Sequence, residues 1–99
     1  MLNVFIEWAS SVAASQSGDT IEAHVTISRE SDNPSARLDF DTPTAVARIT
    51  FWESGRYDAE IIDIDSEQQM YASSGVLHTQ EALPQLFSTF FDVLGTGTK

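Results

Sequence analysis

Hydrophobic residues recur along the chain with two different spacings, which divide it into helical and strand-like segments. From Leu2 to Ala13 they return every three to four positions, which predicts a helix over 1–14 that ends in the polar run 15–19, with Gly18 as its terminator. Between 20 and 73 the spacing is two, which is typical of half-buried strands. Helical spacing then returns and predicts a helix over 79–94, followed by a frayed tail over 95–99.

The second helix has recognisable boundary residues. Thr79 is a suitable N-cap, and Glu81 falls in the first turn, where the helix dipole favours an anion. Pro84 is tolerated because it lies near the start of the helix, and it can delay the regular helix to that point. Gly95 follows the last apolar residue and is expected to stop the helix.

The strongest strand signal is the segment 45–64, in which two apolar arms flank Glu53-Ser54-Gly55. A three-residue loop with Gly last suits a type I turn followed by a left-handed residue, and it pairs Trp52 with Arg56. A two-residue loop would set Phe51 against Asp58 and mix apolar with charged residues on each face, so that register is rejected. The accepted register gathers one apolar face, made of Ala47, Ile49, Phe51, Tyr57, Ala59 and Ile61.

Three further segments complete the expected sheet. Residues 20–29 and 36–41 alternate apolar and polar side chains around a turn at 30–35, and a short strand at 69–73 follows a polar turn at 65–68. We therefore expect one domain over 1–99 of the α+β class: a two-layer fold with an N-terminal helix, a four- to five-stranded antiparallel sheet and a C-terminal helix, both helices on one sheet face. The expected core comprises Phe5, Val25, Leu38, Ile49, Phe51, Ile61, Phe87 and Phe90.

Composition adds a strong charge signal. Fifteen acidic residues against five basic ones give a formal net charge of -10, which disfavours nucleic acid and anionic membranes as partners and favours a basic protein. The alternative is that the charge only keeps a small domain soluble. The chain has no Cys, no basic leader and no apolar run of the ~20 residues that a membrane span needs, so a cytoplasmic location is expected.

The residues that carry chemistry are few. There is no Cys nucleophile, Gly-rich phosphate loop or Ser–His–acid arrangement, so we expect no enzyme, cofactor, metal or small-molecule ligand. His24 is interpreted as an exposed strand residue and His78 as a loop residue. Residues 63–67 resemble the start of a calcium loop, but Gln68 and Ser74 stand where such a loop needs Gly and Glu.

The side of the hairpin away from the core offers a possible protein-binding surface. Trp52 beside Arg56 is an aromatic–arginine pair of the kind that anchors interfaces, although it could equally be a cation–π pair that only covers the sheet, or Trp52 could be covered by Trp8 or Tyr71. Acidic residues continue along the next strand and turn as either a docking edge or a solvated surface, and Arg48 is expected to form an exposed ion pair with Glu60. The candidate partner-binding residues are Trp52, Glu53, Arg56, Asp58, Glu60, Asp63 and Asp65.

One segment lies between the opening helix and a closing helix of the Thr79-Gln-Glu-Ala-Leu type. It is the segment 48–62, Arg-Ile-Thr-Phe-Trp-Glu-Ser-Gly-Arg-Tyr-Asp-Ala-Glu-Ile-Ile. In this respect the chain resembles the TriTu family of immunity proteins. The resemblance implies a partner, the ADP-ribosyltransferase toxin domain TreTu, which is carried on Rhs polymorphic toxins and modifies elongation factor Tu. It also implies inhibition by direct binding, and it transfers no contact residues. The alternative function is a non-inhibitory binding module, such as a secretion chaperone or adaptor.

Overall fold

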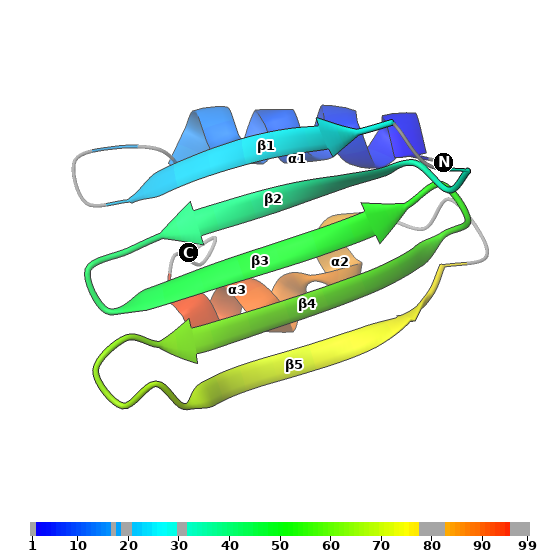
Figure 1. Cartoon of the computed structure of the whole chain (residues 1–99). Coiled ribbons are helices and arrows are strands. Elements are labelled where there is room, and N and C mark those ends of the chain that lie inside the picture. Colours follow the sequence, from blue (N-terminus) through cyan, green and yellow to red (C-terminus); the bar gives the residue numbers. More distant parts are fainter. Residues whose placement is uncertain (1, 17, 19–20, 30–31, 78–82, 96–99) are drawn as a thin grey trace.

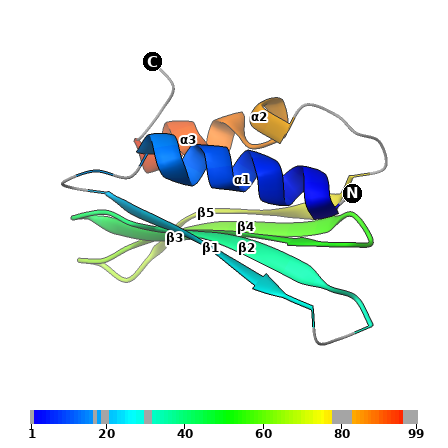
Figure 2. The same ribbon diagram turned by 90° about the horizontal axis from the view of Figure 1, so that it is seen from above.

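The computed structural model describes residues 2–16, 18, 21–29, 32–77 and 83–95. One helix precedes five strands and two short helices follow them: α1 (Leu2–Gln16), β1 (Glu22–Ser28), β2 (Ser35–Asp41), β3 (Ala45–Trp52), β4 (Arg56–Asp63), β5 (Gln69–Val76), α2 (Leu83–Leu86) and α3 (Ser88–Leu94). The strands form one antiparallel sheet in the order β1-β2-β3-β4-β5, so every strand lies beside its neighbour in sequence (Figure 1). The helices lie together on one face of the sheet (Figure 2), which confirms the two-layer α+β prediction.

The β3–β4 hairpin has the predicted register. Phe51 pairs with Tyr57, Ile49 with Ala59 and Ala47 with Ile61. Gly55 has a φ of 96° and donates its N–H to the Trp52 carbonyl at 2.9 Å, as a left-handed residue after a tight turn should. The turn therefore decides which side chains face the helices and which face outward.

The core lies between the sheet and the helices, with α1 over β1, β2 and β3 and α3 over β4 and β5. Aromatic rings join the layers: Phe5 stacks on Phe51 with centroids 5.0 Å apart, and Phe40 meets Phe91 edge-on at 5.8 Å. All the predicted core residues are buried except Val25, which is half-buried. Val25 belongs to β1, an edge strand with no further strand beside it, and that edge leaves its neighbour Ile27 45% exposed.

Two boundaries differ from the prediction. Helix α1 continues to Gln16, and Gly18 does not take a left-handed conformation but donates its N–H to the Ile21 carbonyl at 2.8 Å. Strand β5 runs to Val76 rather than 73, because its ladder with β4 continues through Ser73, Ser74 and Gly75. A Cβ on Gly75 would lie 2.8 Å from the Tyr57 hydroxyl, so any larger residue there would displace the Tyr57 ring.

The C-terminal helix is interrupted. Phe87, with φ −106° and ψ 16°, separates α2 from α3, and its buried ring lies between Trp8 and Tyr57 at centroid distances of 5.5 Å to each. Gly95 ends α3 in the left-handed conformation, with φ 85°, which confirms its role as a stop. The expected N-cap Thr79 and first-turn Glu81 lie outside the described residues. No helix in the described part of the chain combines the length and apolar composition needed to cross a membrane.

Candidate interaction surface

The sheet face opposite the helices, here called the open face, is not covered by any described element (Figures 1 and 2). It carries alternate residues of all five strands, arranged in rows by the strand register. One row runs Thr26, Arg37, Thr50, Asp58, Ser74, and the next runs His24, Asp39, Arg48, Glu60, Ala72. His24 is exposed, as predicted, and His78 lies outside the described residues. The open face is therefore a continuous surface that carries many polar side chains.

Trp52 and Arg56 lie side by side at one end of this face. The Arg56 guanidinium carbon is 5.6 Å from the centre of the Trp52 ring, which is a cation–π contact. Trp52 is half-buried and Arg56 is exposed. Trp8 and Tyr71 do not cover Trp52, because their rings lie on the helix side, 5.5 Å from Phe87 and 6.1 Å from Phe90 respectively. The aromatic–arginine pair is thus presented outward.

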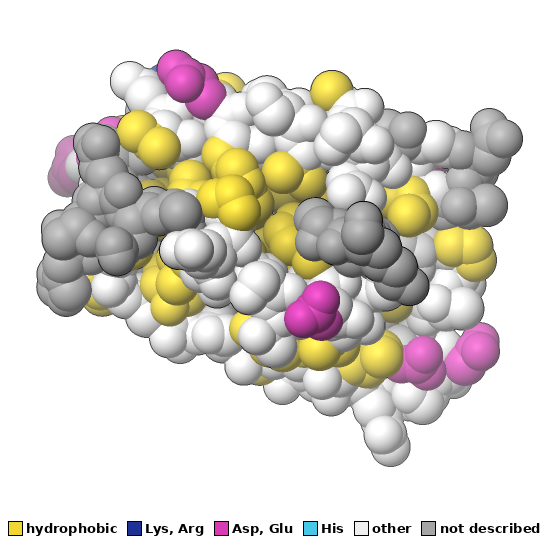
Figure 3. Space-filling model, turned by 180° about the vertical axis from the view of Figure 1, so that it is seen from behind, with side chains coloured by type: hydrophobic (Ala, Val, Ile, Leu, Met, Phe, Trp, Pro, Cys, Tyr) yellow, Lys and Arg dark blue, Asp and Glu magenta, His cyan; other side chains and the backbone are white. Residues whose placement is uncertain are grey.

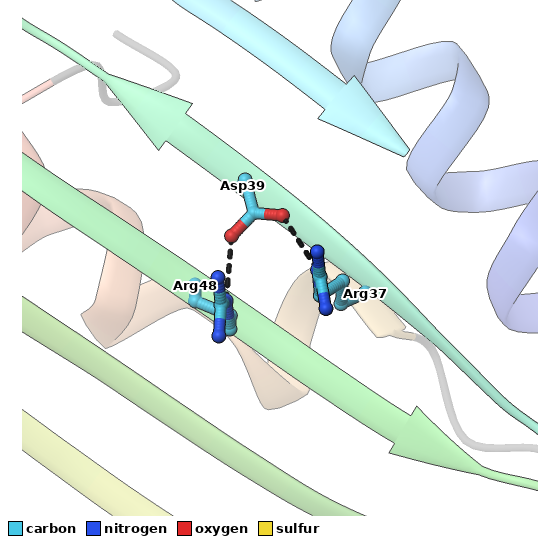
Figure 4. Close-up of polar contacts among 3 residues, drawn as sticks. All are labelled: Arg37, Asp39 and Arg48. Atoms are coloured by element: carbon cyan, nitrogen blue, oxygen red, sulfur yellow. Dashed lines mark hydrogen bonds and ion pairs between the residues drawn. The ribbon is translucent and has the colours of Figure 1, made fainter. Parts of the chain in front are cut away.

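An ion-pair chain that the sequence reading missed crosses the middle of the open face (Figure 4). Asp39 accepts from Arg48 Nε at 2.6 Å on one carboxylate oxygen and from Arg37 Nε at 3.0 Å on the other. Arg48 does lie opposite Glu60 in the register, but the predicted ion pair between them is wrong, since Arg48 turns to β2. Glu60 instead accepts from Gln69 Nε2 at 3.0 Å.

A signal for this chain was present in the sequence. Arg37 and Asp39 are two positions apart in β2 and so share a face, and the short connection from β2 to β3 sets Asp39 opposite Arg48. The cluster of Arg37, Asp39 and Arg48 carries no excess negative charge. Asp58 and Glu60 on β4 have no ion pair within the described part of the chain, and neither has Asp41, which lies opposite Glu22 in the register. Uncompensated negative charge of the open face therefore lies along β4 and also where β1 and β2 meet at Glu22 and Asp41.

The seven candidate residues do not form one compact site. Glu53 lies in the β3–β4 turn beside Trp52, whereas Asp63 and Asp65 lie at the β4–β5 turn, at the other end of β4 (Figure 1). At about 3.3 Å per residue, Arg56 and Asp63 are roughly 23 Å apart along the strand. Asp58 and Glu60 lie between these two ends. Only a partner that covers the length of β4 could contact all seven.

Asp63 already has a local structural role. Its carboxylate accepts the Ser66 N–H at 2.9 Å and the Ser66 hydroxyl at 2.8 Å, and these bonds, the N–H first, hold the pKa of Asp63 below its ordinary value. Both hydrogen bonds fall on the same carboxylate oxygen, Oδ2, which is thereby engaged within the turn. Among the described residues, no three His, Cys, Asp or Glu side chains are grouped so as to hold a metal ion.

A family model described as immunity protein TriTu matches residues 3–93. The chain belongs to the TriTu family. The match spans the structure from α1 to α3 and confirms the resemblance seen in the hairpin and closing helix. No curated protein matches the chain. An immunity protein binds a cognate toxin, so this TriTu member needs a surface on which a protein can dock.

The open face of this TriTu protein has two shallow depressions. On the open face, a shallow depression of about 380 Å³ is lined by Asp58, Glu60, Ala72 and Ser74, together with Ala59, Gln69 and Ser73. A second, of about 240 Å³, lies on the other side of Glu60 against Val46, Arg48 and Ile62. Glu60 therefore stands between two hollows that a partner's side chains could fill.

The helix side offers a different kind of surface. Figure 3 shows hydrophobic side chains gathered across its middle, and a groove of about 220 Å³ between α1 and the C-terminal helices is lined by Trp8, Val12, Pro84 and Phe91. Trp8 and Phe91 already contact each other's rings, with centroids 6.1 Å apart, so this groove is continuous with the core. The open face, in contrast, bears the outward-facing Trp52–Arg56 pair and acids without an ion pair among the described residues, which makes it the stronger candidate for toxin binding.

Proposed function

We propose that this protein neutralises an ADP-ribosyltransferase toxin domain of the TreTu type, which acts on elongation factor Tu, by binding it directly and occluding its active-site cleft. The open face is the binding surface in this proposal. The observation that carries it is the outward-facing Trp52–Arg56 pair, 5.6 Å from ring centre to guanidinium carbon, on a face that no described element covers. Trp and Arg are the side chains most enriched among residues that dominate interface energies.

Charge supports the same assignment. The net charge of -10 attracts a basic partner and speeds the encounter, and the uncompensated acids Asp58 and Glu60 lie on the strand that also carries Arg56. Inhibition by occlusion requires no chemistry from this chain, which fits its shortage of nucleophiles and phosphate-binding loops. The protein would act in the cytoplasm, where elongation factor Tu is found.

Co-purification followed by an activity assay tests the proposal. The toxin domain encoded in the neighbouring gene is expressed with this protein, and the complex is isolated and assayed for ADP-ribosylation of elongation factor Tu. We expect an equimolar complex and a loss of activity that is complete at equimolar inhibitor. A complex that remains fully active would favour a chaperone or adaptor role instead, and failure to form any complex would refute the proposal.

A pair of charge reversals tests the assignment of the surface. Asp58→Lys changes the charge of the open face by two units, and Asp92→Lys makes the same change at an exposed position of α3, on the other side of the molecule. We expect Asp58→Lys to weaken toxin binding at least tenfold and Asp92→Lys to leave it near the wild-type value. If Asp92→Lys weakens toxin binding more than Asp58→Lys does, the binding surface lies on the helix side.

A further inference from the structure

Strand β5 forms an edge of the sheet with which no described element pairs, and only one of the usual devices against pairing with another chain is present on it, a register shift at Met70. Natural edge strands are shielded by such bulges, by charged side chains, by proline, by shortness or by a covering element. The segment Gln69–Val76 is eight residues long and contains no charged residue and no proline. No described residue pairs with its outer side, and Val76 is 51% exposed.

The backbone groups that face this free edge can be identified. Leu77 donates its N–H to the Gly55 carbonyl at 2.8 Å, so the backbone of Leu77 faces β4. Backbone direction alternates along a strand, so Gly75, Ser73 and Tyr71 also bond to β4, their partners in the ladder. The N–H and C=O groups of Ala72, Ser74 and Val76 therefore point away from the sheet, ready to bond an added strand.

The side chains beside this edge give an added strand a specific chemistry. Ala72 and Ser74 are small and lie on the open face next to Glu60 and Asp58, their partners in the register. Together they line the depression of about 380 Å³ at the β4–β5 border. A long cationic side chain on a strand beyond β5 would cross Ala72 or Ser74 without obstruction and reach a carboxylate that has no ion pair within the described residues.

We propose that the free edge of β5 binds an extended segment of the toxin as a sixth strand, and that this segment carries Lys or Arg side chains that reach across Ala72 and Ser74 to Glu60 and Asp58. Strand addition of this kind derives affinity from main-chain hydrogen bonds and specificity from alternate side chains. The inference rests on the proposed function and adds the mode of binding and the chemistry of the bound segment. A second copy of this chain is a poorer occupant, because both copies carry a charge of -10.

Amide exchange measured by NMR tests the pairing directly. On addition of the toxin domain, the amides of Ala72, Ser74 and Val76 should become slow to exchange, while those of Ser73 and Gly75, already bonded to β4, should change less. Unchanged exchange at Ala72, Ser74 and Val76 in a saturated complex would overturn the inference while leaving the proposed function intact.

Ser74→Pro provides a second readout, because proline removes an outward N–H without removing a bond to β4. We expect it to keep the wild-type circular dichroism spectrum and to weaken toxin binding at least tenfold. Wild-type affinity in this folded variant would refute strand addition. If the variant does not fold, the amide-exchange result decides.

A matched lysine pair tests the charge requirement. Ser74→Lys and Thr26→Lys add the same charge to the same row of the open face, at its β5 end and its β1 end. We expect Ser74→Lys to reduce affinity at least tenfold and Thr26→Lys to change it less than threefold; equal effects would contradict the inference. If analytical ultracentrifugation shows a homodimer, and Ser74→Pro dissociates it, the edge binds a second copy instead. A wild-type protein that binds no toxin would refute the proposed function as well.

Discussion

At the scale of the single residue, Trp52 lies half-buried on the open face, and the proposed function gives it a role in binding. It is held by Arg56 and not by the aromatic residues of the core. We expect Trp52→Ala to weaken toxin binding by about 2 kcal/mol, roughly thirtyfold, because aromatic anchors concentrate interface energy. Titration calorimetry and circular dichroism melts measure the two effects separately.

The control for this variant is Asp65→Ala, since Asp65 is exposed on the β4–β5 turn. It should change affinity far less than Trp52→Ala. If Trp52→Ala melts much lower and binds only in proportion to its folded fraction, Trp52 is a structural residue. A stable Trp52→Ala protein with full affinity would remove Trp52 from the interface.

Asp63 provides a prediction about pH. Because the Ser66 hydrogen bonds lower its pKa in the folded protein, the ionised group stabilises the fold above the ordinary value of 3.8, and this contribution is lost as the pH falls through the lowered pKa. Asp63→Asn should therefore melt below the wild type at neutral pH, and the gap should narrow as the pH is lowered beyond 3.8. A difference in melting temperature between wild type and Asp63→Asn that stays the same at every pH would contradict this role of Asp63.

Glu67 is held in an unfavourable backbone conformation. Its φ is 60°, the only positive value at a non-glycine residue in the described part of the chain. A side chain costs roughly 1–2 kcal/mol in the left-handed region, which glycine avoids. We expect Glu67→Gly to raise the free energy of unfolding by about 1 kcal/mol, measured by urea denaturation. Asp65→Gly, two residues earlier, should lower it; a destabilised Glu67→Gly protein would show that the Glu67 side chain compensates for its backbone.

At the scale of the secondary-structure element, the parts that the sequence predicted are those where a local feature sets the geometry. Gly55 fixes a turn, and the turn fixes the register of the seven residue pairs between β3 and β4, so both faces of the hairpin could be predicted from a short stretch of sequence. Strand β5 was predicted too short because Ser73, Ser74 and Gly75 show no alternation; the ladder with β4 and the Tyr57 ring over Gly75 extend it. Neither influence is visible in the local pattern.

The interaction surface was less predictable than the fold because its side-chain contacts also depend on tertiary structure. The residues on the outer side of the hairpin could be assigned from its register, but the partner of Arg48 depended on a choice between two neighbouring strands. Asp39 on β2 and Glu60 on β4 both lie opposite Arg48, and the additional pairing of Asp39 with Arg37 is a tertiary result. Sequence spacing indicates which side chains can meet and not which of two equivalent contacts forms.

Phe87 connects the helical layer to the sheet, and its truncation is the strongest test of the two-layer packing. Its ring is buried between Trp8 and Tyr57 at the point where α2 ends and α3 begins. We expect Phe87→Ala to destabilise the fold by ~3–5 kcal/mol, the usual cost of removing a buried phenyl ring. Thr89→Ala, on the exposed side of α3, serves as the control and should melt near the wild type. A Phe87→Ala protein of wild-type stability would show that the two layers hold together without this ring.

At the scale of the whole molecule, a net charge of -10 bears on solubility and on association with a partner, and not on the choice of fold. If the charge steers a basic toxin, the association rate constant should fall steeply with added salt, while dissociation changes less. Stopped-flow fluorescence at several ionic strengths measures both constants. An association rate that does not change with salt would leave the charge with a role in solubility alone.

The strand order β1-β2-β3-β4-β5 also bears on how soon after the start of synthesis a folded molecule can bind a toxin. Every strand pairs with the one made just before or after it, and α1 packs on the three strands that follow it, so most stabilising contacts join segments that are close in the chain. Proteins of mixed composition with such local connectivity fold on the order of milliseconds. Synthesis at about 5–20 residues per second takes far longer for a chain of 99 residues. Translation, and not folding, therefore sets the delay between the start of synthesis and the first molecule able to bind a toxin.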